Sequence, residues 1–343
     1  MALPANFTEP SSSSSSMTDN PVVDSFFPRY GYTTLSVIMG IVTVTAVTLN
    51  STVIIVTSRH RQLRQPLNYA LVNLAVADLG TAVMGGMPAV LSNAAGRHMT
   101  GRAGCVLEGF SVSLFGITAL CTVALIAAER LFVVRKPLGN MKFQAWHAVT
   151  GVVVSWVWSL IWNTPPLFGW GDYQLEGVKT SCGPDWHSRK PGNVSYILCY
   201  FLLCFAIPFT FIIVSYSWLL LTLRQVARLG GGATAKAEAK VAWMVVAMVL
   251  AFLVSWLPYA VLALVVVCDP DVNFSPLVAM VPVYLAKSST VYNPLIYIFM
   301  NKQFRKFAVP FLFCGRNPWM VEESEVELHT TVSSISNQVS PEP

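Results

Sequence analysis

The chain is poor in charge. Of its 343 residues only 11% are Asp, Glu, Lys or Arg, whereas 54% are hydrophobic. Soluble domains carry roughly 25% charged residues, so this sequence lacks the polar side chains that a water-facing surface needs. The shortage excludes a soluble globular protein and indicates a membrane protein. The net charge of +5 does not predict a nucleic-acid partner, because the basic residues lie between apolar runs, where membrane topology requires them.

Metal-binding patterns and a leader segment are also missing. The seven cysteines form no CxxC pair and no Cys/His pattern with metal-ligand spacing. The first residues, MALPANFTEPSSSSSSMTDNP, have no basic start, no apolar core and no small-residue cleavage motif. We therefore expect no cleavable signal peptide, and we expect the first apolar run to direct membrane insertion.

Long apolar runs are what the sequence has instead. About 20 residues cross the hydrocarbon core at a rise of 1.5 Å per residue. The predicted fold class is therefore an all-α membrane protein, a seven-transmembrane helix bundle. Its seven spans are predicted at residues 32–58, 68–92, 103–134, 147–169, 194–223, 239–268 and 276–299.

Segments outside the bundle have their own patterns. NKQFRKFAVPFLFCG interleaves basic residues with phenylalanines, which predicts an amphipathic eighth helix on the membrane surface. The hydroxyl-rich end of the chain has no core pattern, so we expect it to be disordered. The predicted organisation is an N-terminal tail of residues 1–31, the bundle at 32–299, the amphipathic helix at 300–314 and a cytoplasmic tail at 315–343.

Basic residues are distributed unequally between the two faces. Six lie on the face of the N-terminus and fifteen on the opposite face, and Lys287 is the remaining one of the 22. The positive-inside rule therefore predicts an extracellular N-terminus. The sequons at Asn6 and Asn193 fall on that face, and both are predicted glycosylation sites.

A lysine stands in the middle of the last apolar run. Lys287 lies within VPVYLAKSSTVYNPLIYIF, and a charge near the bilayer centre costs at least about 2.5–3.5 kcal/mol. Either a partner anion compensates for the charge or the charge is removed. Apolar surroundings favour the neutral amine, which is the form that condenses with an aldehyde to a Schiff base.

Two acidic residues have predicted partners elsewhere. Glu129 precedes Arg130, so these two can pair at the inner membrane edge. Asp78 is expected to join Asn50 and Asn293 in a hydrated polar cluster. Buried ionisable groups in a membrane are candidates for function by default.

Glu108 is then left as the partner of Lys287. The lysine lies eleven residues after Pro276, which is roughly 16 Å along a helix, whereas Glu108 lies about one turn into its run. A bare lysine is therefore expected to reach Glu108 incompletely, and a cation extended by a ligand or aided by water fits better. A plain salt bridge between helices stays open as the alternative.

Aromatic residues near this lysine could wall a flat polyene. They are Phe252, Trp256 and Tyr259 in the sixth span and Trp186 and Tyr173 in the loop before the fifth span. Aromatic residues at helical spacing usually reflect ordinary packing. Only the lysine favours the interpretation as a pocket.

Several motifs occur in a characteristic order. They are LVNLAVADL at 71–79, GCVLEG at 104–109, AERL at 128–131, FLVSWLPYA at 252–260 and KSSTVYNPLIY at 287–297. Their order and spacing resemble the rhodopsin-like G-protein-coupled receptors. Lys287, six residues before the asparagine of NPxxY, resembles the opsins in particular. Segments such as TSCGPDW and FMNKQFRKFAVPFLFCGRNPW are similar to a pineal, non-visual branch, whose members are typically bistable and sensitive to ultraviolet or short-wavelength light.

The resemblance implies a chromophore and its charge partners. Retinal, 11-cis in the dark and all-trans after light, would be attached as a Schiff base to Lys287. Glu108 and the loop acid Glu176 would be its counterions, and the sequence does not rank them. Ser113 and Gly116 would join the aromatic residues in the pocket.

The resemblance also implies a disulfide and a signalling face. Cys182 would bridge to Cys105. A heterotrimeric G protein of the transducin or inhibitory class would be the partner, in a plasma or photoreceptor-cell membrane. The residues implied in coupling and activation are Glu129, Arg130, Glu238, Asn293, Pro294 and Tyr297.

Modification sites are predicted after the bundle. Cys314 could carry a palmitoyl chain. Phosphorylation by a receptor kinase would recruit arrestin through added negative charge, and the candidate sites are Thr330, Thr331, Ser333, Ser334 and Ser336.

Three departures limit the resemblance. Leu131 replaces the usual tyrosine after Glu129–Arg130, so that position has no hydroxyl. Cys204 stands where visual pigments carry a histidine, and Ile117 stands where some carry an acid. Their proton-linked activation and wavelength assignments therefore do not transfer.

Two other functions stay open. One is a retinal photoisomerase of the retinochrome type, and the other is a receptor for a diffusible ligand in which Lys287 is a plain ion-pair partner. The intact Glu129–Arg130 and Asn293–Tyr297 motifs favour a receptor over an enzyme.

Overall fold

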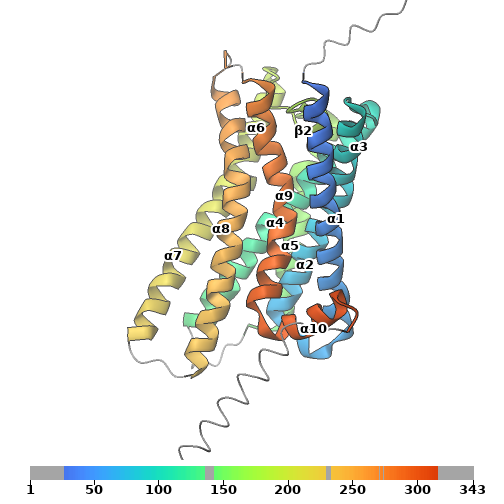
Figure 1. Cartoon of the computed structure of the whole chain (residues 1–343). Coiled ribbons are helices and arrows are strands. Elements are labelled where there is room, and N and C mark those ends of the chain that lie inside the picture. The colour runs from blue at the N-terminus through green and yellow to red at the C-terminus, as the bar shows by residue number, and fades with distance from the viewer. Residues whose placement is uncertain (1–26, 136–142, 229–232, 270, 273, 316–343) are drawn as a thin grey trace, which may run out of the picture.

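The computed structural model describes residues 27–135, 143–228, 233–269, 271–272 and 274–315, except for the side chains of some residues near the ends of α4, α7 and α8. Each predicted span contains a membrane-length helix or pair of helices within this part of the chain (Figure 1), although the α-helix of the fourth span ends at Asn163 and a 3₁₀ turn, Pro165–Phe168, follows it. The α-helices of the described residues are α1 (Arg29–Arg59), α2 (Pro66–Thr81), α3 (Met87–Ala95), α4 (Gly101–Arg135), α5 (Ala145–Asn163), α6 (Pro191–Tyr200), α7 (Ile207–Arg228), α8 (Ala233–Cys268), α9 (Pro276–Met300) and α10 (Lys302–Leu312).

Two spans change helical pitch at a proline. A π-helical turn, Ala82–Gly86, joins α2 to α3, and another, Phe201–Ala206, joins α6 to α7. Pro88 and Pro208 follow these turns closely. A proline clashes with the carbonyl four residues before it, and for both prolines that carbonyl lies in the π-helical turn. The wider turn accommodates the lost hydrogen bond without ending the span.

The helix that carries Lys287 is the least apolar span. Six helices of the described chain are long and apolar enough to cross a membrane, and α9 falls short of that measure. It has 25 residues, enough to span, but Lys287, Asn293 and several hydroxyl residues lower its hydropathy. Because α9 packs against α8, α1 and α2 inside the bundle, those polar residues face protein rather than lipid.

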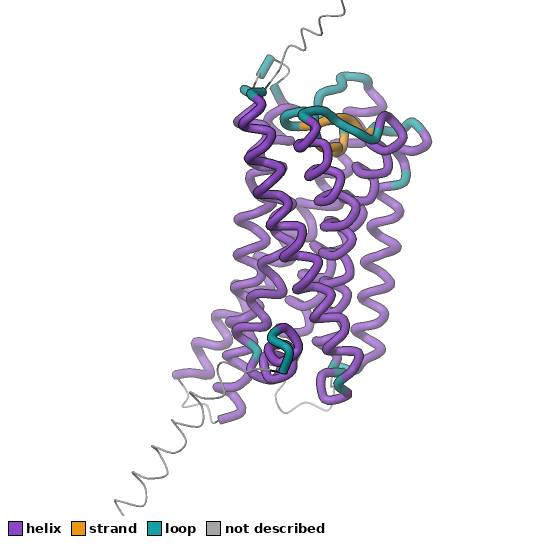
Figure 2. The backbone as a smooth tube through the Cα atoms, turned by 45° about the vertical axis from the view of Figure 1, so that its right-hand side comes forward, coloured by secondary structure: helices purple, strands orange, loops and turns teal. Residues whose placement is uncertain are grey.

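A two-stranded hairpin lies across one end of the bundle (Figure 2). Strands β1 (Tyr173–Glu176) and β2 (Ser181–Pro184) pair antiparallel, with Glu176 opposite Ser181. All four residues of β2 are buried. Strand β2 therefore forms an inner layer against the helices, whereas Gln174 and Leu175 of β1 are exposed.

Helix α10 lies across the other end of the bundle (Figure 1). Asn301 caps it by accepting a hydrogen bond from the amide of Phe304 at 3.2 Å. Phe304 is buried, and the ring of Phe307 stacks on His60 with centroids 4.1 Å apart. The amphipathic pattern of this segment thus forms a helix docked beside the end of α1.

Candidate functional site

Lys287 forms a direct ion pair with Glu108. Its Nζ lies 2.9 Å from Oε1 of Glu108, and the two side chains are only 4% and 2% exposed. Nζ also contacts the Ser181 hydroxyl and lies 3.4 Å from the Gly85 carbonyl. The buried charge therefore has a charged partner and further oxygen neighbours, as membrane burial requires.

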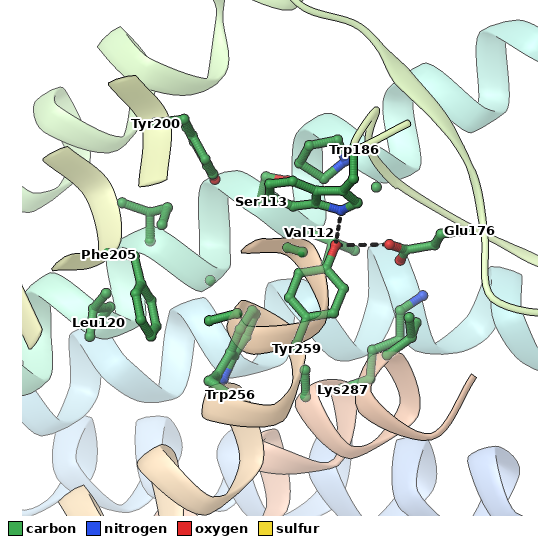
Figure 3. Close-up of a pocket in the computed structure, with 18 of the residues that line it drawn as sticks. Val112, Ser113, Leu120, Glu176, Trp186, Tyr200, Phe205, Trp256, Tyr259 and Lys287 are labelled. Atoms are coloured by element: carbon green, nitrogen blue, oxygen red, sulfur yellow. Dashed lines mark hydrogen bonds between the residues drawn. The ribbon is translucent and has the colours of Figure 1, made fainter. Parts of the chain in front are cut away.

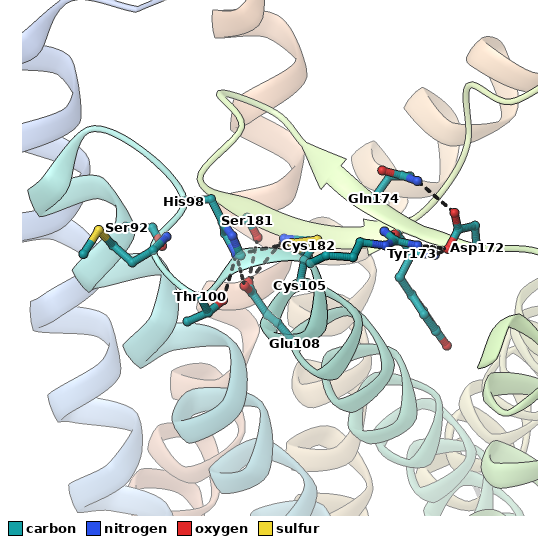
Figure 4. The surroundings of a disulfide bond; sticks show 12 residues. Ser92, His98, Thr100, Cys105, Glu108, Asp172, Tyr173, Gln174, Ser181 and Cys182 are labelled. Atoms are coloured by element: carbon teal, nitrogen blue, oxygen red, sulfur yellow. Dashed lines mark hydrogen bonds and ion pairs between the residues drawn. A yellow bond between two sulfur atoms is a disulfide. The ribbon is translucent and has the colours of Figure 1, made fainter.

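Strand β2 supplies further partners of the same carboxylate. Oε1 of Glu108 accepts from the Ser181 hydroxyl at 3.1 Å and from the Cys182 amide at 3.3 Å. A carboxylate that accepts several hydrogen bonds is stabilised in its charged form. The Cys105–Cys182 disulfide fixes this strand to α4, with Cα atoms 5.4 Å apart, which confirms the pairing that the resemblance implied (Figure 4).

The predicted gap between Lys287 and Glu108 is wrong. In the structure Glu108 lies seven residues after the start of α4 and Lys287 lies eleven residues after the start of α9. The two positions therefore differ by four residues, or roughly 6 Å along a helix. The extended lysine stem spans that difference, because a long side chain can lie along apolar surface and present its amine at a distance from its own backbone. The structure therefore contains the salt bridge between helices that the sequence left open as the alternative.

Glu176 occupies a different place in the same site. Its Oε2 accepts a hydrogen bond from the Tyr259 hydroxyl at 2.8 Å, and that hydroxyl accepts from Nε1 of Trp186 at 3.0 Å (Figure 3). Burial raises the pKa of Glu176 to about 7, although Lys287 and the Tyr259 bond act in the opposite direction. Glu108 is thus the ion-pair partner of the lysine, whereas Glu176 is a second acid that titrates near neutral pH.

A largely apolar cavity extends from the lysine (Figure 3). Its free space is about 870 Å³, counted to its open mouth, which lies in the range of small-molecule sites. Lys287 and Glu176 are among its few charged lining residues. The sequence-predicted residues that line it are Ser113, Gly116, Trp186, Phe252, Trp256 and Tyr259.

The aromatic lining of the cavity suits a flat apolar ligand. A Cβ on Gly116 would lie 2.9 Å from the ring of Trp256, so only glycine fits beside that indole. Trp256 stacks near Phe252 and donates through Nε1 to Ser289 at 3.1 Å. A polyene aldehyde would find an amine at one end of the cavity and aromatic walls along it, so the residues present fit retinal.

Tyr173 does not line the cavity, contrary to the prediction. It is fully buried, its hydroxyl donates to the Asn163 carbonyl at 2.8 Å, and its ring lies against Gly109. The alternation of side chains along β1 explains the difference. Tyr173 and Glu176 are three residues apart, so the strand directs them to opposite faces.

Sequence reasoning missed two residues at the charged site. Ser181 contacts both members of the Lys287–Glu108 pair, and His98 lies 3.4 Å from the other oxygen of Glu108. The position of Ser181 beside Cys182 was the available signal, because the implied disulfide brings that strand to α4. No sequence signal located His98, which belongs to the turn between α3 and α4.

The predicted polar cluster is present in part. Nδ2 of Asn293 donates to Oδ2 of Asp78 at 3.0 Å. Asn50 instead donates to the carbonyls of Thr290 and Ala46, each at 2.9 Å. Asp78 and Asn293 are therefore in contact, whereas Asn50 holds the backbone of α9 beside them.

Glu129 and Arg130 pair at the α10 end of the bundle, as predicted. Both side chains are buried, and the guanidinium contacts both carboxylate oxygens. Pro294 and Tyr297 lie in α9, and Tyr297 is fully buried. Glu238 lies in α8, but its side chain is outside the described part, as are Asn6 and the five predicted phosphorylation sites.

Two predicted modification sites differ in exposure. Cys314 is an exposed free thiol just after α10, and its palmitoylation stays a prediction. Asn193 is buried, and its Nδ2 donates to the carbonyls of Asp185 at 2.7 Å and Ser188 at 3.2 Å. In this conformation the Asn193 amide is used in hydrogen bonds, and its glycosylation stays a prediction.

Comparisons with known proteins agree on one family. Residues 49–297 match the family described as 7 transmembrane receptor (rhodopsin family). The chain is 59% identical to parapinopsin of Ictalurus punctatus over 93% of this chain and 94% of that one. It is 48% identical to pinopsin of Columba livia, over 85% and 84% of the two chains.

A solved structure agrees with the sequence relatives. Squid rhodopsin superposes with a TM-score of 0.78 at 30% identity, covering 87% of this chain and 91% of that one. The predicted seven-helix fold and the similarity to the pineal branch are both confirmed, and opsins are receptors and not enzymes. The chain therefore belongs to the opsins, within the rhodopsin family of seven-transmembrane receptors, and is a multi-pass membrane protein.

Proposed function

We propose that this opsin is a non-visual, bistable light sensor that binds retinal as a Schiff base on Lys287. The observation that carries the proposal is a buried lysine at the end of an aromatic-walled cavity, beside two carboxylates. Retinal supplies an aldehyde, which condenses with the amine with loss of one water, and an 11-cis polyene that light converts to all-trans. The remaining steps belong to the residues of the chain.

Glu108 is proposed as the first counterion. It already pairs with Nζ of Lys287 at 2.9 Å, and strand β2 holds its Oε1 from the other side. Glu176 is proposed as the second counterion, because it lies in the same cavity and titrates near neutral pH. Two acids offer the nitrogen a partner in more than one position, which supports a photoproduct that stays bound and returns to the dark form. Ultraviolet or short-wavelength sensitivity is supported by the likeness to the pineal opsins alone.

Trp256 is the proposed contact between the cavity and the signalling end. Its indole lies against Gly116 of α4 and bonds Ser289 of α9, so it joins three helices. Pro258 lies two residues further along α8, where a proline permits bending. A ligand that becomes longer would displace the indole and shift the balance between two bundle arrangements.

The α10 end is the proposed cytoplasmic face. The excess of basic residues on that face supports this orientation and an extracellular N-terminus in the plasma or photoreceptor-cell membrane. Opsins belong to the G-protein-coupled receptors, and Glu129–Arg130 is the buried pair expected to open toward the partner. We propose a transducin or inhibitory G protein as that partner, and a receptor kinase and arrestin for the hydroxyl-rich tail.

An absorption spectrum with added 11-cis-retinal tests the proposal. The purified full chain should gain a retinal-dependent band, and Lys287→Ala should show none. Light should convert the band to a second colour, and a second wavelength should restore it. Lys302→Ala is the matched control, because it removes a lysine at the start of α10, far from the cavity.

Each other outcome changes a different part of the proposal. A band that bleaches would keep the retinal site and remove bistability. A band without light-dependent nucleotide exchange on a G protein would favour the photoisomerase. No band in the wild-type chain would leave Lys287 as a salt-bridge residue in a receptor for a diffusible ligand.

A further inference from the structure

The two oxygens of Glu108 have different partners. Oε1 accepts hydrogen bonds from Nζ of Lys287, the Ser181 hydroxyl and the Cys182 amide. Oε2 faces His98, whose Nε2 lies 3.4 Å away (Figure 4). Among the described residues, His98 is the one side chain recorded at that second oxygen. The carboxylate therefore lies between the lysine and an imidazole.

His98 is held in place by its own turn. The backbone amides on either side of His98 both donate to Ser92. The Arg97 amide donates to the Ser92 carbonyl at 3.0 Å, and the Met99 amide donates to the Ser92 hydroxyl at 3.3 Å. Ser92 is fully buried, and the His98 side chain is only 7% exposed. An imidazole fixed in this way is positioned by the fold and does not sample the site as a free surface side chain.

Hydrogen-bond chemistry assigns the proton on the imidazole. An ionised carboxylate only accepts, so Nε2 must carry the hydrogen that faces Glu108. Nδ1 is then the nitrogen that gains a proton when the ring becomes cationic. The separation of 3.4 Å is longer than the usual 2.9–3.0 Å for such bonds. Protonation would strengthen and shorten this contact, because bonds between charged groups are shorter.

We propose that His98 is a positioning residue for the Lys287–Glu108 pair: it holds Oε2 of Glu108, leaves Oε1 to the lysine, and when protonated places a second cation on the same carboxylate. The inference rests on the proposed retinal site. The turn between α3 and α4 thereby takes part in setting the colour of the pigment and its response to extracellular pH.

Other charged groups around the imidazole come from several elements. The carboxylate of Glu108, on α4, contacts the imidazole directly. Lys287, on α9, lies on the other side of that carboxylate. Glu176 on β1 is the strand partner of Ser181, and burial raises its pKa to about 7. Arg97 precedes His98 in its turn, and Arg102 at the start of α4 is paired with Asp172. Thr100 and the disulfide sulfur of Cys182 add neutral neighbours, at 3.3 and 3.4 Å from Nε2.

The spectral consequence has a definite direction. Light absorption moves positive charge from the protonated nitrogen along the polyene, so an anion beside that nitrogen stabilises the ground state more than the excited state. A second cation on Glu108 weakens this stabilisation. Protonation of His98 should therefore shift the visible band to longer wavelength.

The test is a pH titration of the visible-absorbing form of the retinal-bound full chain. Wild type should shift to longer wavelength as the pH falls from about 8 to 5. His98→Gln keeps a neutral donor, so its band should stay at the wild-type position of high pH at every pH. His98→Phe removes the donor, so its band should lie at shorter wavelength and also not respond. His98→Gln carries the test if His98→Phe does not bind retinal.

Two controls separate His98 from other groups. The titration is repeated with Glu176→Gln, because Glu176 itself titrates in this range, and the His98-dependent shift should persist there. His187→Gln removes an exposed histidine of the loop after β2 and should behave as wild type. A His98→Gln pigment with the full wild-type response would overturn the inference while leaving the proposed function intact. Absence of any retinal band in wild type would instead refute the proposed function.

Discussion

The hairpin end and the α10 end of this bundle handle buried polarity differently. At the hairpin end the charges of Lys287 and Glu108 meet directly, and β2 completes their hydrogen bonds. At the α10 end Asp78 bonds neutral Asn293. There the hydroxyls of Tyr216 and Tyr297 are buried with no hydrogen-bond partner among the described residues.

The difference indicates which end is preorganised. Satisfied charges hold one arrangement, because removing a partner leaves an uncompensated ion. A buried hydroxyl without a partner costs free energy, and any rearrangement that supplies a partner or water recovers it. The Lys287–Glu108 site is therefore suited to hold a ligand, and the surroundings of Tyr216 and Tyr297 are suited to rearrange.

The largest effect is expected from Glu108→Gln. It leaves the buried Lys287 without its anion, and breaking a buried ion pair costs about 3–5 kcal/mol. The retinal-free chain should lose stability accordingly in a thermal-inactivation measurement. Glu176 lies in the same cavity and can partly compensate the charge of Lys287. The loss of stability should therefore be near the lower end of that range. An unchanged midpoint would show that the pair is not what stabilises this end.

Removal of the Cys105–Cys182 disulfide should come next. The double variant to serine releases β2 from α4 and should cost about 2–4 kcal/mol. Because β2 also holds Glu108, retinal binding should weaken together with stability. Cys268→Ser, at an exposed free thiol, is the matched control, and an equal loss in that variant would contradict the assignment.

Glu176 should make stability depend on pH. Its pKa rises from 4.5 to about 7 in the folded chain, so the folded state binds more protons than the unfolded state between these values. Stability is therefore greatest at low pH and falls as the pH rises from 4.5 through 7. The fall should be about 1–2 kcal/mol, reduced by solvent screening at a half-buried site. Thermal midpoints should fall less across this range in Glu176→Gln than in wild type.

Asp78→Asn sharpens the comparison between the two ends. Its partner Asn293 is neutral, and an asparagine oxygen can still accept from Nδ2. The free energy of unfolding should therefore change by about 0.5–1.5 kcal/mol in either direction. This is well below the loss expected for Glu108→Gln. A loss as large as that of Glu108→Gln would show that a cation pairs with Asp78, so that the two ends would not differ.

Tyr297→Phe should have the smallest effect on the resting state. The hydroxyl that it removes has no partner among the described residues, so stability should change by less than about 0.5 kcal/mol. Light-driven G-protein activation is the measurement that should respond, if the hydroxyl finds its partner only after rearrangement. A large loss of stability would place that hydroxyl in a hydrogen bond of the resting state.

Local and compositional features were predictable along the chain. The seven spans, the amphipathic segment and the pairing of Glu129 with Arg130 depend on hydrophobic runs and on neighbours in sequence. Lys287 was identifiable because a charge inside such a run needs an explanation. The motif order led to the opsins and to the Cys105–Cys182 bridge, because it carries information about spacing that composition lacks.

Contacts between distant elements were not predictable in the same way. The reach from Lys287 to Glu108 depends on side-chain extension and on how α4 and α9 pack, so counting residues along two helices underestimated it. Tyr173 was misplaced because one strand directs its side chains to two faces.

The sequence by itself determined that this protein spans a membrane, carries a buried amine and belongs among the opsins, since these follow from composition and motif order. Only the tertiary structure decided which acid the amine meets, that Ser181 and His98 surround that acid, and that Glu176 bonds Tyr259. The physical reason is distance: electrostatic and hydrogen-bond partners are chosen within a few ångströms, and residues far apart in sequence reach that range only when the bundle and the hairpin are assembled.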